Sequence, residues 1–208
     1  MKTDGILFDL DGTLWDSVPE ILLTWNRVIA GIPGLRAPID RREQESVMGL
    51  QMDEIARRLF PGQPSDRQTE LMEACVQEEN KYLYQHGGTL YPGVRETLTV
   101  LHKKFPLYIV SNCQSGYIEA FLHAHRLEDA FDGFTCYGDT MRSKGENMRA
   151  LADQYGLRAP VYVGDTQGDL DAAEFAKIPF VYAAYGFGHP VHWDEIINQF
   201  SDLISLFE

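Results

Sequence analysis

The sequence has few basic residues and no long hydrophobic run. It carries 18 Lys and Arg against 31 Asp and Glu, so its formal net charge is −13. Proteins that bind the phosphate backbone of nucleic acid need a basic surface, and we therefore expect no nucleic-acid partner. The first apolar run, Ile6 to Phe8, is too short for a signal-peptide core, and no later run approaches a membrane span. We expect no membrane association.

Cysteine is also scarce. Cys75, Cys113 and Cys136 are odd in number and widely spaced, and no pair is close enough for a metal clip or a redox motif. Free thiols fit a reducing compartment, so we expect a cytoplasmic protein. The 208 residues are enough for one core domain with a small second domain, in a monomer or a homodimer.

Short apolar runs bounded by turn residues recur along the chain and predict buried strands. They are residues 6–10, 107–110, 134–137, 161–163 and 180–183. Segments of helical period lie between them, such as 148–155 before Gly156. This alternation predicts a Rossmann-like, doubly wound parallel α/β sheet. The apolar stripe from Ile196 to Phe207 predicts a C-terminal helix that packs on this core.

Residues 16–88 interrupt the alternation, because they carry helical patterns almost throughout. Ser17 to Glu20 has the spacing of a capping box at the start of the first of these helices. Gly87 and Gly88 indicate a hinge back to the sheet. We therefore predict a core domain of residues 1–15 and 89–208 and an inserted helical domain of residues 16–88.

Two aspartates, Asp9 and Asp11, directly follow the first predicted strand, and Gly12 permits a sharp turn after them. Open α/β sheets place their sites at the carboxyl ends of strands. Residues at i and i+2 of an extended segment face opposite ways. One carboxylate can then serve as nucleophile and metal ligand, and the other as acid and base. A solvated turn is the alternative.

A second acidic loop follows the predicted strand at 161–163 and contains Asp165 and Asp169. Two acidic strand ends together indicate a hard divalent cation bound by carboxylate oxygens. The alternative for Asp169 is a helix N-terminal residue favoured by the helix dipole.

Three further residues are candidates for holding a phosphate. Ser111 and Asn112 follow the strand at 107–110, and Lys144 begins the helix before the Asp165 strand. Each is weak evidence alone, because Ser and Asn are common in loops and a lysine at a helix start is usually solvated.

Taken together, the order and spacing of these motifs resemble the four signature motifs of the haloacid dehalogenase superfamily. The residues that carry the resemblance are Asp9, Asp11, Gly12, Thr13, Leu14, Ser111, Asn112, Lys144, Asp165 and Asp169. The helical insertion resembles the C1 cap of that superfamily. The chain is most similar to the branch of the phosphoglycolate phosphatases and phosphoglucomutase-like enzymes.

The resemblance implies a covalent mechanism. Asp9 would attack phosphorus and form an aspartyl-phosphate, while Asp11 would protonate the leaving alkoxide and later activate water. Mg²⁺ would be held by Asp9, the backbone carbonyl of Asp11 and Asp165, with Asp169 orienting metal-bound water.

The same resemblance implies that Ser111, the backbone amide of Asn112 and Lys144 neutralise and position the phosphoryl oxygens. We therefore expect a Mg²⁺-dependent phosphatase acting on a small phosphorylated metabolite, such as phosphoglycolate, a sugar phosphate or a nucleotide. A phosphomutase of the β-phosphoglucomutase type is an alternative, because it uses the same aspartate pair. A non-catalytic binding member of the fold is another.

In the resembling branch, a loop between cap helices faces the phosphate site. The best match here is the segment that contains Met48, Gly49, Leu50 and Gln51. Gly49 would let this loop approach a ligand closely. The alternative is a simple turn between two helices.

Overall fold

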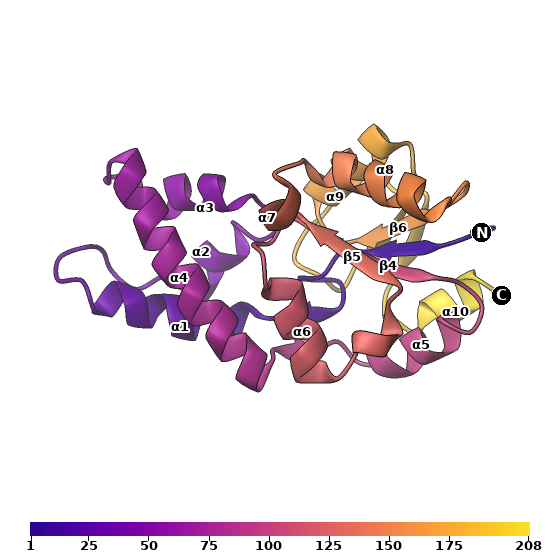
Figure 1. The fold of residues 1–208 in the computed structure, drawn as a ribbon, viewed down its shortest axis with the longest axis horizontal. Coiled ribbons are helices and arrows are strands. Elements are labelled where there is room, and N and C mark those ends of the chain that lie inside the picture. Colours follow the sequence, from indigo (N-terminus) through magenta and orange to yellow (C-terminus); the bar gives the residue numbers. More distant parts are fainter.

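The computed structural model describes residues 1–208 and places a parallel β-sheet between two layers of helices (Figure 1). The strands lie in the order β5-β4-β1-β6-β7-β8, and each neighbouring pair is parallel. In chain order they are β1 (Ile6–Phe8), β4 (Leu107–Ser111), β5 (Gly133–Cys136), β6 (Val161–Gly164), β7 (Phe180–Ala183) and β8 (Glu195–Ile197). The prediction of a doubly wound parallel sheet is confirmed.

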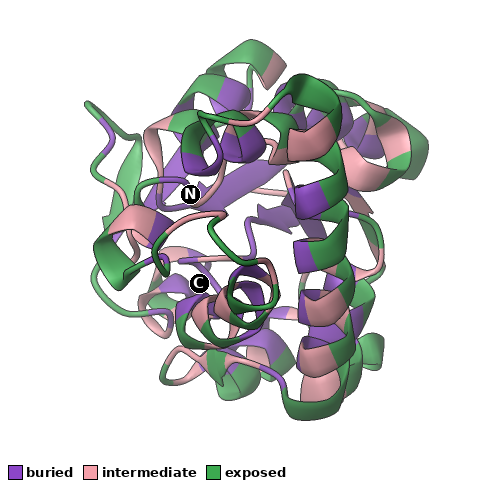
Figure 2. Ribbon diagram, turned by 90° about the vertical axis from the view of Figure 1, so that its left-hand side faces the viewer, coloured by how far each residue is buried: buried purple, intermediate pink, exposed green.

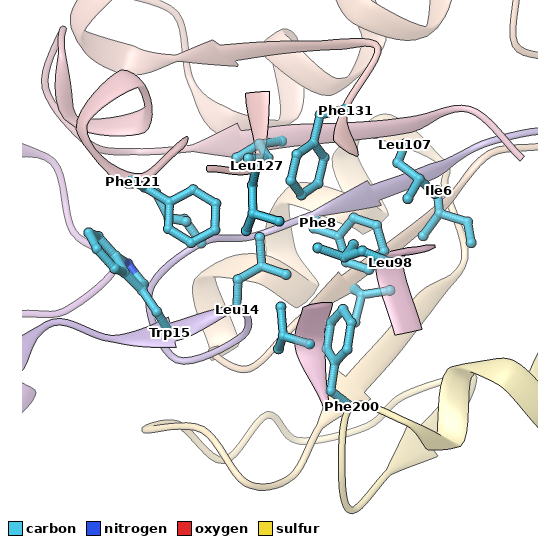
Figure 3. Packing of buried hydrophobic residues seen from close by; sticks show 14 of the residues in the cluster. Ile6, Phe8, Leu14, Trp15, Leu98, Leu107, Phe121, Leu127, Phe131 and Phe200 are labelled. Atoms are coloured by element: carbon cyan, nitrogen blue, oxygen red, sulfur yellow. The ribbon is translucent and has the colours of Figure 1, made fainter. Parts of the chain in front are cut away.

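The sheet is buried on both faces because its strands are apolar at successive positions. Ile6 and Phe8 of β1 point into one hydrophobic cluster, and Leu7 points into another on the opposite face. Figure 3 shows the first cluster, in which Phe8 lies close to Leu14 and Phe200. The central strands β1, β4, β6 and β7 are therefore buried, whereas the edge strands β5 and β8 and the outer sides of the helices are partly exposed (Figure 2).

Helices α5, α6 and α10 cover the first face of the sheet, and α8 and α9 cover the second. The helices of the sheet domain are α5 (Val94–Leu101), α6 (Tyr117–His125), α7 (Tyr137–Thr140), α8 (Lys144–Tyr155), α9 (Gln167–Ala176) and α10 (Asp202–Leu206), with a 3-10 turn at Glu128–Ala130. No helix in the molecule combines the length and the apolarity that crossing a membrane requires.

The topology creates a crevice beside the central strand. From β1 the chain proceeds to β4 and β5 on one side, and it then returns to β6 on the other side of β1. In doubly wound sheets the reversal of strand order separates the loops at the carboxyl ends of the neighbouring strands. The loops that follow β1, β4 and β6 therefore surround one opening.

A group of helices stands apart from the sheet, at the left of Figure 1. They are α1 (Val18–Ala30), α2 (Arg41–Glu45), α3 (Met52–Leu59) and α4 (Ser65–His86). They pack around a hydrophobic cluster of their own that includes Trp25, Leu59 and Leu71. Two short strands connect this group to the sheet, since β2 (Trp15–Asp16) pairs antiparallel with β3 (Thr89–Leu90). The domain boundaries at residues 16 and 88 stay a prediction.

The predicted capping box at Ser17 is wrong. Helix α1 does begin at Val18, but the Ser17 side chain makes no capping hydrogen bond, and its backbone is already in the helical region at φ −101° and ψ −4°. The Ser17 hydroxyl donates instead to Asp11 Oδ1 at 2.6 Å. A hydrogen bond from a hydroxyl to a carboxylate is stronger than one between neutral groups. The Ser17 side chain is therefore oriented toward Asp11 and does not accept a backbone N–H of α1.

The predicted single helix from Ile196 to Phe207 is also wrong. Glu195–Ile197 forms the edge strand β8, which pairs with β7, and only Asp202–Leu206 is helical. A turn separates the two, because Asp202 Oδ2 accepts the backbone N–H groups of Asn198 and Gln199. The stripe still packs on the core, because Ile197, Phe200, Leu203 and Phe207 are all buried. A strand followed by a short helix thus buries these residues as well as one continuous helix would.

This packing gives a first prediction. Phe200 is 1% exposed, and its ring centroid lies 5.7 Å from that of Phe8. Phe200→Ala should lower the free energy of unfolding by about 3–5 kcal/mol, because it leaves a cavity under the central strand. Phe134→Ala is the control, because Phe134 is 38% exposed. This substitution should lower the free energy of unfolding by less than half as much. Urea denaturation measures both, and equal small losses would contradict the packing of the C-terminal segment.

Candidate active site

Polar side chains from three adjacent strands meet at the carboxyl edge of the sheet. Asp9 follows β1, Ser111 ends β4 and Asp165 follows β6. Because β1 lies between β4 and β6, the sheet brings these three residues to the same opening. Each of them is buried. Carboxylates that are buried at a strand end are not the solvated turn that was the alternative for Asp9.

Lys144 lies at the centre of this group. Its Nζ donates to Asp9 Oδ1 at 2.8 Å and to Asp169 Oδ1 at 2.6 Å, and the side chain is only 4% exposed. Ser143 and Glu146 form a capping box that begins α8 at this lysine. Burial lowers the pKa of Lys144, but the charges of Asp169 and Asp9 outweigh it and hold the pKa above its usual value. The ammonium group is therefore charged and not solvated.

Asp169 is saturated with hydrogen bonds. Its Oδ1 accepts from Lys144 and from the Tyr162 hydroxyl at 3.0 Å. Its Oδ2 accepts the Thr166 backbone N–H at 2.9 Å and hydroxyl at 2.7 Å, in a capping box at the start of α9. Burial raises the pKa of Asp169, but Lys144 and these donors bring it below its usual value. A carboxylate with both oxygens engaged is suited to orienting its neighbours.

The donor set fits a divalent cation. Oxygen atoms of Asp9, Asp165 and Asp169 all lie within 4.8 Å of one another. Burial, followed by the charge of Asp169, raises the pKa of Asp9 to about 7, and burial with the same charge raises that of Asp165. Three buried carboxylates face one ammonium group, so negative charge is in excess. Mg²⁺ prefers carboxylate oxygens and would balance that charge.

Asp165 is held by backbone groups that glycines allow to approach. Its Oδ2 accepts the Phe187 N–H at 2.6 Å. Gly12 adopts φ +85°, and a Cβ at Gly12 or Gly186 would collide with the Asp165 carboxyl group. Gly12 was predicted to permit a turn, and it also leaves room for this carboxylate.

Asp11 faces a different set of partners from Asp9. Its Oδ1 accepts from Trp15 Nε1 at 2.9 Å, from Ser17 Oγ at 2.6 Å and from the Tyr117 hydroxyl at 2.7 Å. Burial raises the pKa of Asp11, although these hydrogen bonds lower it in part. A carboxyl group that holds its proton more tightly than usual is a candidate general acid.

Sequence reasoning did not link these three partners to Asp11. Trp15 and Ser17 follow Asp11 by four and six residues, so their proximity was a usable signal. Tyr117 lies 106 residues from Asp11 along the chain, and no local pattern links them.

A small cavity lies between the helical group and the sheet. It is lined by Asp9, Asp11, Ser111 and Asn112 from the sheet side. Its lining on the helical side includes Ile21, Trp25, Gln44, Met48, Gly49, Leu50, Met52, Ile55 and Glu79. Two of the predicted phosphate-site residues, Ser111 and Asn112, thus face the same space as Asp9 and Asp11, whereas Lys144 does not line it.

The predicted cap loop lies over this cavity. Met48, Gly49 and Leu50 line it, and Asn112 Nδ2 donates to the Gly49 carbonyl at 2.8 Å. Gln51 does not line it and instead occupies the N-cap position of α3. The loop is therefore in contact with Asn112, and its role in specificity stays a prediction.

Glu79 is a lining residue that sequence reasoning missed. It is 2% exposed, and its Oε2 accepts from Trp25 Nε1 at 2.6 Å. The signal was present, because Glu79 lies four residues from both Cys75 and Leu83 on the buried face of α4. A carboxylate on an apolar helical face is rarely buried without a reason.

Comparison with known proteins places this geometry in a family. Residues 6–183 match the family described as haloacid dehalogenase-like hydrolase. The chain belongs to that family. It is 30% identical over 197 residues to the phosphoglycolate phosphatase of Aliivibrio fischeri, a match that covers 88% of this chain and 85% of the relative. It is also 30% identical over 219 residues to the phosphoglycolate phosphatase of Photobacterium profundum, covering 97% and 94%.

Solved structures share the fold. A predicted phosphoglycolate phosphatase from Haemophilus somnus superimposes with a TM-score of 0.87 at 23% identity, covering 98% of this chain and 97% of that one. CbbY from Rhodobacter sphaeroides, in complex with xylulose-(1,5)bisphosphate, has a TM-score of 0.82 at 19% identity, covering 97% and 96%. The family match and the relatives identify the chain as a phosphatase of the haloacid dehalogenase type, as predicted.

The carboxylate cluster gives a second prediction, on metal binding. Mg²⁺ should raise the Tm more at pH 8 than at pH 6, because the proton that Asp9 holds at the lower pH must be displaced first. For each pH unit below the pKa of the carboxyl group, the proton that must be displaced weakens Mg²⁺ binding about tenfold. At saturating Mg²⁺, each tenfold loss of affinity removes about 1.4 kcal/mol of stabilisation. Thermal unfolding with and without Mg²⁺ measures this.

Asp165→Asn should lose most of the Mg²⁺ effect on Tm, because it removes a ligand charge. Asp153→Asn is the matched control, since Asp153 is exposed on α8 and should leave the effect intact. An unchanged Mg²⁺ effect in Asp165→Asn would place the metal elsewhere.

Proposed function

We propose that the chain hydrolyses small phosphate monoesters with the help of Mg²⁺, through an aspartyl-phosphate on Asp9. The observation that carries this proposal is the buried contact of Asp9 Oδ1 with Lys144 Nζ at 2.8 Å, beside Asp165 and at the mouth of the cavity. A carboxylate next to a fixed ammonium group and a metal site can approach a phosphoryl group without prohibitive repulsion. Mg²⁺ held by Asp9, the Asp11 carbonyl and Asp165 would add positive charge for the phosphoryl oxygens.

In the first step, an Asp9 oxygen attacks phosphorus and the bond from phosphorus to the leaving oxygen breaks. Asp11 gives its proton to that oxygen, so the product leaves as an alcohol. All three of its hydrogen bonds go to Oδ1, which leaves Oδ2 to carry the proton. Ser111, the Asn112 backbone N–H and Lys144 hold the transferring phosphoryl oxygens.

In the second step, water attacks the aspartyl-phosphate and the bond from phosphorus to Asp9 breaks. Asp11, now ionised, takes a proton from the water, and inorganic phosphate is released. Asp169 keeps Lys144 in place and orients water near the metal. Asp9 and Asp11 thus return to their starting states after each turnover.

The proposed substrate is a small phosphorylated metabolite. Two relatives of the chain are phosphoglycolate phosphatases, so phosphoglycolate is one compound to test. The residues that line the cavity favour phosphate monoesters of another class, described in the next subsection. We also propose a reducing compartment such as the cytoplasm, because the three cysteines are buried as free thiols.

The third prediction concerns the nucleophile. Asp9→Asn should lower Mg²⁺-dependent phosphate release from p-nitrophenyl phosphate by more than about a thousandfold, because an amide cannot form the covalent intermediate. The variant should melt no lower than wild type, since it loses a buried charge. Asp66→Asn, on the exposed side of α4, is the control. Residual turnover above that level in pure protein would reject Asp9 as the nucleophile.

The fourth prediction concerns Asp11. p-Nitrophenolate is stable enough to leave without being protonated. An alkoxide is not, and it needs a proton from a general acid as it leaves. Asp11→Asn should therefore retain a burst of about one p-nitrophenol per enzyme and then stall, because water is no longer activated. Ethyl phosphate should give no burst. Rapid-mixing absorbance measures the first reaction, and the absence of a burst would show that Asp11 serves the site in some other way.

A further inference from the structure

The helical side of the cavity has no cationic group. None of the sixteen residues that line it is Lys, Arg or His. Lys144 is engaged by Asp9 and Asp169 on the sheet side, and Arg41 is exposed and paired with Asp16 and Glu45. A leaving group that carries a carboxylate would therefore enter this space without a partner of opposite charge.

The cavity contains hydrogen-bond acceptors that lack donors. Gln44 is 1% exposed, its Oε1 has no partner, and its amide nitrogen contacts only the Met48 sulfur at 3.7 Å. Either orientation of this amide leaves a buried polar atom unpaired. Asn112 Oδ1 is also buried and unpaired, and here the orientation is set because Asn112 Nδ2 donates to the Gly49 carbonyl. Buried acceptors without donors cost free energy that a ligand would recover.

Glu79 adds a carboxyl group to the same wall. The Trp25 indole holds its Oε2, and Gln114 donates at 2.9 Å to the neighbouring Asn80. Burial and the charge of Asp11 raise the pKa of Glu79 to about 8, despite hydrogen bonds from Trp25 and Gln114. A ligand carboxylate would meet the same burial and the same negative neighbour. An ammonium or hydroxyl group would be favoured there instead.

Resting on the phosphatase function proposed above, we infer that the cavity selects monoesters whose leaving alcohol offers hydroxyl or ammonium donors and no carboxylate, with Glu79 and Gln44 as the selecting residues. Glu79 accepts from a hydroxyl of the leaving alcohol, or gives up the proton that burial keeps on it and pairs with an ammonium group. A second donor is accepted by Asn112 Oδ1, whose orientation is fixed, and by Gln44 when its amide oxygen faces the cavity. Phosphoglycolate, whose leaving alcohol carries a carboxylate, is a poor fit.

The test measures kcat/KM of the wild-type enzyme, in the presence of Mg²⁺, for four phosphate esters with small leaving groups. Ethyl phosphate has no donor, glycerol 3-phosphate offers hydroxyls, phosphoethanolamine offers an ammonium group, and phosphoglycolate carries a carboxylate. At least one of the two donor esters should exceed ethyl phosphate in kcat/KM by tenfold or more, and the better one identifies the donor. Phosphoglycolate should fall at least tenfold below ethyl phosphate.

Three outcomes contradict specific parts of the argument. No phosphate release from any ester would overturn the proposed function itself. Release that is fastest from phosphoglycolate would leave the phosphatase standing and overturn the inference. Equal kcat/KM on all four esters would also overturn it, because the cavity would then select nothing.

Two variants assign the selection to residues. Glu79→Gln keeps an oxygen for the Trp25 indole and should reduce the preference for the better donor ester over phosphoglycolate by tenfold or more. Glu78→Gln, at the adjacent, half-buried position on α4 where Glu78 pairs with Arg27 outside the cavity, should change that ratio by less than about twofold. Gln44→Leu should reduce the preference for the donor ester over ethyl phosphate at least fivefold. Unchanged ratios in both Glu79→Gln and Gln44→Leu would remove these residues from the assignment.

Discussion

The buried ammonium group of Lys144 is the interaction on which the site depends. It joins the end of β1, the start of α8 and the start of α9 through Asp9 and Asp169. Without it, two buried carboxylates would face each other in a medium of low dielectric constant. Burying an ion pair costs free energy in desolvation, so such a group persists where it has a function besides stability. Here the ammonium group sets a positive charge beside Asp9, the nucleophile proposed above.

The rest of the site follows from this placement. Asp9 faces Lys144 and Asp165, whereas Asp11, two residues later, faces Trp15, Ser17 and Tyr117. The two aspartates of one short segment therefore have separate surroundings. This separation is what the proposed mechanism requires, in which one carboxyl group acts on phosphorus and the other carries a proton. The helical group contributes no member of the Lys144 network and lines the other side of the cavity.

The sequence was sufficient to predict most of the sheet and the positions of its polar residues. Apolar runs that end in Asp9, Ser111 or Asp165 place those residues at one edge of any parallel sheet. The role of Tyr117 could not be predicted, because its contact with Asp11 depends on tertiary packing across 106 residues. The strand β8 was missed for a local reason. Its apolar residues match a helical stripe, and only the turn closed by Asp202 separates strand from helix.

The central position of β1 has a consequence for how the chain assembles. Ile6 pairs with Leu107 on one side and with Val161 on the other, so β1 is completed by segments far along the chain. During synthesis, β1 must wait for β4 and then for β6, whereas α1 to α4 already have their own apolar cluster. The segment that carries Asp9 is thus among the last to be fixed. A chain that stops short of β6 cannot assemble the Asp9 environment, because Asp165 and Asp169 both follow that strand.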